Sequence, residues 1–165
     1  MLYSPQLLFI KLKKMDTASL IIGLVLTLVC AVPLFYIANN QAKNKKKVKE
    51  IFNHFRQGKY DFSTRETHYK KIYALDKENK GFLFIDLNKE NDRASFVDVS
   101  EINSCRIEET SSGNDDKILF TFKLKNGNTT SIVLYDLEND KLGKAYWQEN
   151  EQIAKKWQLI VESTI

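Results

Sequence analysis

The chain is poor in the residues that build metal sites, disulfide frameworks and phosphate-binding loops. It has two cysteines, two histidines, two prolines and six glycines in 165 residues. Cys30 and Cys105 are isolated, so their spacing predicts neither a metal site nor a disulfide. His54 and His68 form no zinc-type motif. We therefore expect no metal and no cofactor, and the cysteine usage fits a reducing compartment.

Catalytic motifs are missing as well. No serine lies in a G-x-S-x-G elbow, and no glycine-rich phosphate loop occurs. Carboxylates occur as the adjacent pairs Glu108–Glu109 and Asp115–Asp116. Neighbouring residues of a strand point to opposite faces, so such pairs do not form a catalytic dyad. The sequence predicts no catalytic residues, and we expect that the protein is not an enzyme.

Basic charge is scarce in the larger, C-terminal part of the chain. Residues 60–165 carry 15 Lys/Arg and 19 Asp/Glu, whereas residues 1–59 carry ten and two. A nucleic-acid-binding domain carries its positive charge on the folded part, so this distribution counts against nucleic acid as a partner. The basic excess instead lies beside an apolar segment, and a lipid bilayer is its natural partner.

Residues 18–38 form an uncharged, mostly apolar run of 21 residues. A helix of that length is about 30 Å long and can cross the hydrocarbon core of a bilayer. A cleaved signal has a shorter apolar core, and a lipoprotein signal needs a small residue where Val29 precedes Cys30. Both alternatives are weaker than a permanent transmembrane helix, so we expect a single-pass membrane protein.

The flanking lysines predict the orientation of this helix. More lysines follow the run than precede it, which places the C-terminal side in the cytoplasm by the positive-inside rule. Met15 resembles a true translation start, with residues 1–17 as an N-terminal segment. Without the lysines before Met15, the asymmetry becomes strong. We expect the inner (cytoplasmic) membrane as the location and a cytoplasmic C-terminal domain.

Residues 39–59 read as a basic amphipathic juxtamembrane helix or linker. Val48, Ile51, Phe52 and Phe55 recur at helical spacing, and lysines occupy the rest of the circumference. This segment can continue the membrane helix, lie on an anionic lipid surface, or dock its apolar stripe on the domain. For the lipid alternative the contact residues are Lys43, Lys45, Lys46, Lys47, Lys49, Phe52 and Phe55.

After Tyr60 the pattern changes to short strands in hairpin order. We expect strands over residues 68–75, 81–87, 95–99, 104–109, 117–125 and 129–137, with a polar loop at residues 110–116. Asn126-Gly127 is a strong hairpin signal. From about Lys144 the apolar spacing predicts a helix that buries Trp157 against the sheet. The fold class is α+β, with six to seven antiparallel strands capped by a C-terminal helix.

This arrangement is similar to the bacterial form of the pleckstrin-homology-like (PH-like) domain. The residues that carry the resemblance are Val99, Ile102, Cys105 and Ile107 in KGFLFIDL…FVDVSEINSCRIEE, followed by Ala154, Lys155, Lys156 and Trp157. Over residues 40–165 the chain resembles small single-pass membrane-anchored proteins of Bacteroidota. The motifs are core patterns, so the resemblance implies a PH-like sheet or barrel over residues 60–165 and no activity.

Two functions remain open. The first is a non-catalytic, membrane-tethered interaction or scaffold module that binds an unidentified membrane protein. The second is binding of a lipid headgroup or small ligand by the PH-like domain. The first hairpin offers Lys70, Lys71, Lys77 and Lys80 for a headgroup, but acidic residues lie between them.

Overall fold

The computed structural model describes residues 17–165 except 90, 92, 112–115 and 141–142. The chain divides into two compact units, Met1–Lys46 and Lys47–Ile165. The second unit therefore contains the expected domain of residues 60–165 together with a helical segment that precedes it. Most of the expected polar loop at residues 110–116, including Asp115, lies outside the described residues.

The first element is the long helix α1 (Thr17–Gln57), which contains Pro33 and runs through the expected linker. In the apolar stretch its large side chains, from Leu20 to Ile37, are 50 to 76% exposed. Within the part of the chain that the structure describes, this is the one helix long and apolar enough to cross a membrane. Length and composition thus agree with the expected transmembrane segment.

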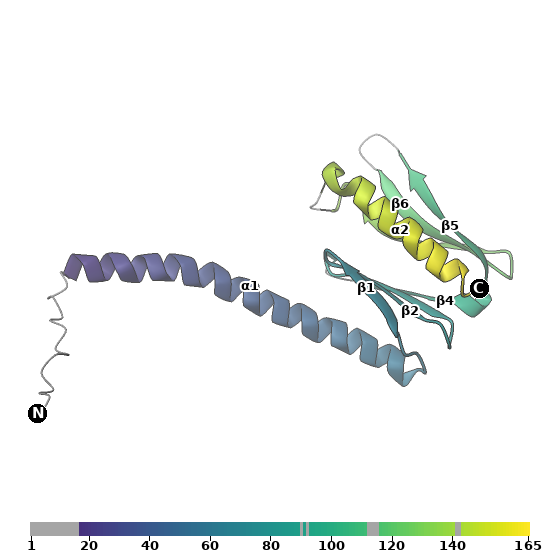
Figure 1. Ribbon diagram of the computed structural model, residues 1–165, viewed down its shortest axis with the longest axis horizontal. Coiled ribbons are helices and arrows are strands. Elements are labelled where there is room, and N and C mark those ends of the chain that lie inside the picture. The colour runs from purple at the N-terminus through teal and green to yellow at the C-terminus, as the bar shows by residue number, and fades with distance from the viewer. Residues whose placement is uncertain (1–16, 90, 92, 112–115, 141–142) are drawn as a thin grey trace, which may run out of the picture. The chain divides into compact units, whose positions relative to one another are not determined.

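In the described residues, seven antiparallel strands follow, in two sheets (Figure 1). They are β1 (Thr64–His68), β2 (Lys71–Asp76), β3 (Gly81–Asp86), β4 (Ala94–Asp98), β5 (Ile102–Thr110), β6 (Lys117–Leu124) and β7 (Thr129–Asp136). The first sheet has the order β1-β2-β3-β4 and the second the order β5-β6-β7. The expected α+β class is confirmed, but the described strands do not close into one barrel.

The strand predictions hold except at the start of the domain. The β2–β3 hairpin and the turn at Gly127, with φ of 88°, are confirmed. The bounds expected for the first strand, residues 68–75, are wrong at their start, because β2 begins at Lys71 and His68 belongs to a separate strand, β1. Strand β1 (TRETH) lies at the sheet edge and buries none of its residues fully, so its sequence has no apolar alternation to reveal it.

The C-terminal helix α2 (Trp147–Glu162) follows two short 3₁₀ segments, η1 (Val99–Glu101) and η2 (Lys144–Tyr146), in the chain. It packs on β5, β6 and β7 (Figure 1). Trp157 is 1% exposed and stacks on Tyr73, with ring centroids 5.5 Å apart. Its indole N–H donates to the Glu66 carboxylate at 2.9 Å, which ties α2 to β1. The predicted burial of Trp157 is confirmed.

A second hydrophobic cluster covers the other face of the four-stranded sheet. Phe62, Ile72, Ala74, Leu83 and Ile85 are buried there, with the apolar side chains of α1 residues 48–55 packed against them. All six residues of β2 and all six of β3 are buried. Strands covered on both faces need no polar alternation, which explains the continuous apolar run GFLFI.

Candidate functional site

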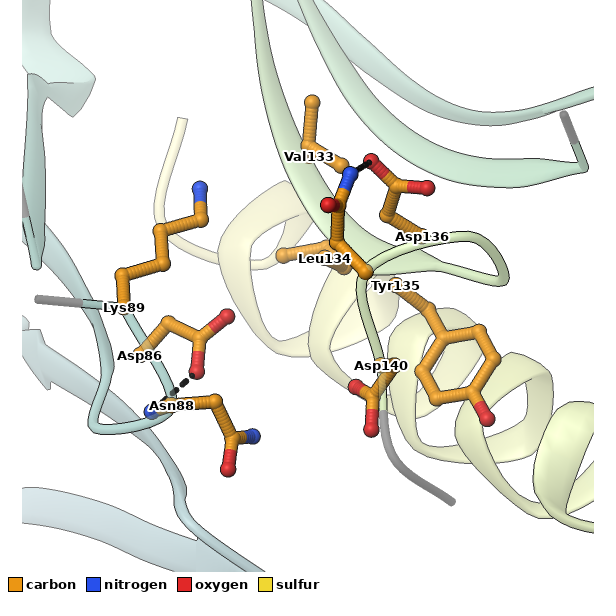
Figure 2. A pocket seen from close by; sticks show the side chains of 9 residues that line it. Asp86, Asn88, Lys89, Val133, Leu134, Tyr135, Asp136 and Asp140 are labelled. Atoms are coloured by element: carbon orange, nitrogen blue, oxygen red, sulfur yellow. Dashed lines mark hydrogen bonds between the residues drawn. The ribbon is translucent and has the colours of Figure 1, made fainter. Parts of the chain in front are cut away.

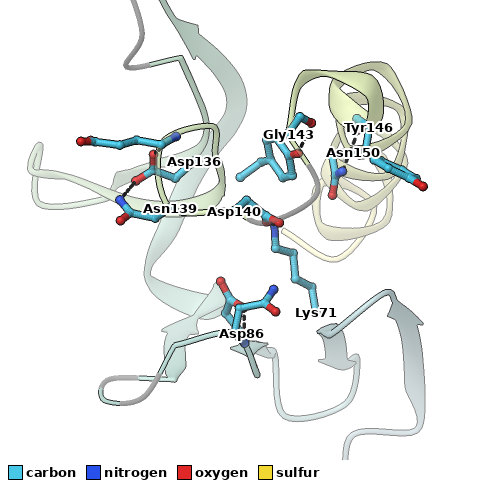
Figure 3. Close-up of polar contacts among 11 residues, drawn as sticks. Lys71, Asp86, Asp136, Asn139, Asp140, Gly143, Tyr146 and Asn150 are labelled. Atoms are coloured by element: carbon cyan, nitrogen blue, oxygen red, sulfur yellow. Dashed lines mark hydrogen bonds and ion pairs between the residues drawn. The ribbon is translucent and has the colours of Figure 1, made fainter.

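A buried ion pair lies where the two sheets meet α2 (Figure 3). Lys71, the first residue of β2, is 1% exposed, and its ammonium group pairs with Asp140 in the loop after β7. The same ammonium lies 4.2 Å from the centroid of the Tyr135 ring, within the range of a cation–π contact. A buried lysine requires such partners because an uncompensated charge in the interior is very costly.

A β-bulge positions Tyr135. The register between β6 and β7 shifts between Ile118 and Leu119, so Leu134 is an extra residue on β7. Both Leu134 and Tyr135 are therefore buried, where a regular strand would expose one of them. The Tyr135 hydroxyl donates to the Gly143 carbonyl at 2.6 Å. Burial, followed by the charge of Asp140, raises the pKa of Tyr135 to about 12, so the phenol stays neutral.

Two further polar atoms are buried in this part of the molecule. The Tyr73 hydroxyl and the Asn150 side-chain oxygen have no hydrogen-bond partner among the described residues. Burial, followed by the nearby charges of Asp86, Glu66 and Asp140, raises the pKa of Tyr73. Asn150 donates its side-chain amide to the Tyr146 carbonyl at 2.7 Å (Figure 3).

A cavity of about 450 Å³ lies beside the ion pair (Figure 2). Its walls are the turn after β3 on one side and β7 with its following loop on the other; they comprise Asp86, Asn88, Lys89, Val133, Leu134, Tyr135, Asp136, Asn139 and Asp140. The volume falls within the usual range for small-molecule sites. The arrangement can hold a small polar molecule.

The carboxylates of this cavity already support the turns that form it. Asp86 accepts a hydrogen bond from the backbone N–H of Asn88 at 2.9 Å. Asp136 accepts from the Asn139 side-chain amide at 2.9 Å. Asp140 is paired with Lys71. The charged groups of these three residues thus hold the turns and the ion pair that shape the cavity.

The expected membrane-surface residues fall into two groups. Lys43, Lys45, Lys46, Lys47 and Lys49 are all exposed on α1. Phe52 and Phe55 are half-buried and pack on the domain, so the structure has the apolar stripe in the docked alternative. Contact of these seven residues with an anionic membrane stays a prediction.

Aromatic contacts hold the docked stripe. The Phe55 ring stacks on Phe96, with centroids 4.9 Å apart. Both Phe55 and Phe52 meet Phe62 edge to face, at 6.2 and 5.6 Å. Such aromatic pairs stabilise by about 0.5–1.5 kcal/mol beyond the area that they bury.

The residues that follow α1 also pack on the first sheet. The Tyr60 ring lies over Gly81, where a Cβ atom would come within 2.5 Å of it. The backbone N–H of Asp61 donates to the Asp76 carboxylate at 2.7 Å, and Asp76 also accepts bonds within its own turn. Gly81 is therefore required for close packing of the segment that joins α1 to β1.

The four lysines of the first hairpin do not form one basic surface. Lys71 is buried in the ion pair, whereas Lys70 and Lys77 are exposed. The Lys80 ammonium donates to the backbone oxygen of Ile165 at 3.1 Å. This dispersion weakens the hypothesis of a specific headgroup site in the hairpin.

Other chemistry is not indicated in the described part of the chain. No cluster of three or more His, Cys, Asp or Glu side chains there has the arrangement of a metal site. Cys105 is buried, and burial raises the pKa of its thiol to about 12, which makes it a poor nucleophile. Comparisons with protein-family models, with curated proteins and with solved structures found no match for this chain.

Sequence reasoning did not find the ion pair or the cavity. Lys71 occurs in the run HYKKIYAL among other polar residues, and Asp140 lies in a polar turn 69 residues away in the sequence. Nothing local distinguishes either residue from a solvated charge. The continuous apolar run of β3 was a signal that could have been used. It indicates a strand that is buried on both faces, and therefore a second element packed on the sheet.

Proposed function

We propose that the protein is a membrane-tethered, non-catalytic interaction or scaffold module. Helix α1 anchors it in the inner membrane, and the C-terminal domain lies in the cytoplasm and binds a membrane protein. The observation that carries the proposal is the composition of α1. Its first part has exposed apolar side chains and its last part packs into the domain. Tethering would concentrate the domain near membrane partners.

The same proposal includes the fold of the C-terminal domain, which we assign to the PH-like class. The seven antiparallel strands among the described residues, followed by a helix that packs on the second sheet, support a PH-like domain. Among the residues behind the resemblance, Val99 and Ile102 are 0% exposed and Cys105 is 6% exposed, as expected of core residues, whereas Lys155 and Lys156 are exposed. They support a fold and leave the partner open.

Membrane extraction combined with partner capture tests this function. The full-length chain should resist alkaline carbonate extraction, and the same membrane protein should co-purify after mild detergent release and after cross-linking in intact membranes. A matched variant with Val25 and Leu28 both changed to Lys should lose the membrane and the partner together. Full extraction of the unaltered chain by carbonate would contradict the proposal.

The cavity favours small-ligand binding as a second function. Its lining combines carboxylates, amides, Lys89 and the apolar Leu134, which suits a small polar ligand. Native mass spectrometry of the full-length protein should then detect a bound small molecule. A Val133→Trp variant, which would place a bulky ring at the wall, should lose that molecule. The proposal fails if the unaltered chain carries none and its hydrogen exchange at Asp86–Lys89 is unchanged by a metabolite extract.

A further inference from the structure

The outer face of the four-stranded sheet has the properties of a helix-binding surface. It presents Ile72, Ala74, Leu83 and Ile85, each no more than 7% exposed. They are covered by α1 together with Tyr60, Leu87 and Phe96. The covering segment reaches them with residues at i, i+3, i+4 and i+7, the spacing of an amphipathic helix bound in a groove. Without that segment the face would be a large exposed apolar patch.

The connection between this segment and its surface is a short turn, closed by backbone hydrogen bonds from Lys59 to Arg56 and from Tyr60 to Phe55, with strain at one residue. Helix α1 ends at Gln57, and Tyr60 already packs on Gly81 and Phe96. Between them Lys59 has φ of 108°, in the region that disfavours a residue with a Cβ atom. Gly58, the residue that would tolerate this conformation, does not adopt it.

A strained hinge next to an exchangeable element is the condition for domain swapping. Exchange preserves the side-chain contacts of the docked segment and relaxes Lys59, but it gives up local hydrogen bonds of the turn, such as the one from the Lys59 N–H to the Arg56 carbonyl. The remaining cost is mainly the entropy of bringing two copies together. Confinement of the anchored chains to one membrane reduces that cost. This step rests on the membrane tethering proposed above.

We propose that residues 48–55 of one copy dock on the β1–β4 sheet of a second copy, so that exchanged α1 helices join two chains. The interaction surface is the outer face of that sheet, and its partner is the amphipathic segment of an identical chain. Phe55 would then lie on Phe96 of the other copy, as it lies on Phe96 of its own chain in the structure.

Cross-linking between two tagged full-length copies tests the exchange. Cys30 and Cys105 are replaced by Ala in both; one copy carries Phe55→Cys and the other Phe96→Cys, and a short bismaleimide is applied in membranes. Exchange predicts a product that carries both tags. Asn53→Cys, on the exposed side of the same helix, is the matched control and should give none. A single chain with both cysteines that cross-links internally, while the mixture gives no mixed product, would overturn the proposal.

A second measurement avoids cysteines in the core. Lys59→Gly removes the strain of the unexchanged chain in both copies and should weaken dimerisation about 30-fold, counted by single-molecule photobleaching in nanodiscs. Lys80→Gly relaxes a comparable positive φ of 54° in the β2–β3 turn and should leave the dimer unchanged. A monomeric unaltered chain, or equal effects of the two glycines, would refute exchange. Membrane tethering would still stand if such a chain fractionates with membranes.

Discussion

Truncation of Trp157 to Ala should remove a large part of the stability of the domain. The side chain is 1% exposed, stacks on Tyr73 and lies 6.1 Å from Phe82, ring centre to ring centre. Trp-to-Ala changes in cores cost about 3–5 kcal/mol. The indole N–H also donates to a carboxylate, which places Trp157→Ala near 4–5 kcal/mol. Total stabilities of domains are about 5–15 kcal/mol.

Urea denaturation of the full-length chain in micelles measures this loss. Trp147 packs on Tyr135 and remains as the fluorescent reporter in the variant. Trp157→Phe is the matched control, because it keeps an aromatic ring against Tyr73 and removes the indole donor together with part of the ring volume. We expect it to cost about 1–3 kcal/mol. A loss below about 1.5 kcal/mol for Trp157→Ala would refute the packing of α2 described above.

Three further predictions concern single contacts. Hydrogen bonds from Lys156, and secondarily from Trp157, lower the pKa of Glu66. The ionised Glu66 should therefore contribute its full stabilisation above the unfolded pKa of about 4.3 and lose it as the pH falls through the lowered folded pKa. Urea titrations at several pH values measure this loss, and Glu66→Gln should flatten the acid dependence. Gly81→Ala should cost about 1–3 kcal/mol, because the added methyl group would collide with the Tyr60 ring. In a Tyr60→Ala background this cost should shrink. Thermal melts in which the losses of the two single variants simply add would exclude the collision. Phe55→Ala should destabilise the domain by about 1–3 kcal/mol and Asn53→Ala by less than about 0.5, and equal effects would mean that the stripe is not docked.

The sequence predicted the elements whose pattern is local. The alternation of Ile118, Phe120 and Phe122, the Asn126-Gly127 turn and the helical spacing around Trp157 each specify structure within a few residues, and the structure agrees. The choice between a linker and a docked helix could not be made this way. It depends on whether Phe55 meets Phe96, which lies 41 residues further along the chain.

The candidate site escaped prediction for a related reason. Lys71, Tyr135 and Asp140 come from separate elements and meet only after both sheets have formed. The bulge at Leu134 that aims Tyr135 inward is a property of strand pairing, and IVLY gives no sign of it. Edge strand β1 was missed because an edge can be stable without alternating apolar residues.

Thiol labelling of one variant tests the membrane-tethered arrangement most directly. Leu159→Cys places a thiol at a position that is 66% exposed on α2, while Cys30 lies in the apolar part of α1 and Cys105 is buried. We predict that a membrane-impermeant maleimide labels the Leu159→Cys variant only after the cells are permeabilised, and that the unaltered chain stays unlabelled until the membrane is dissolved. Labelling of Leu159→Cys in intact cells, or of Cys30 in intact membrane vesicles, would contradict the account.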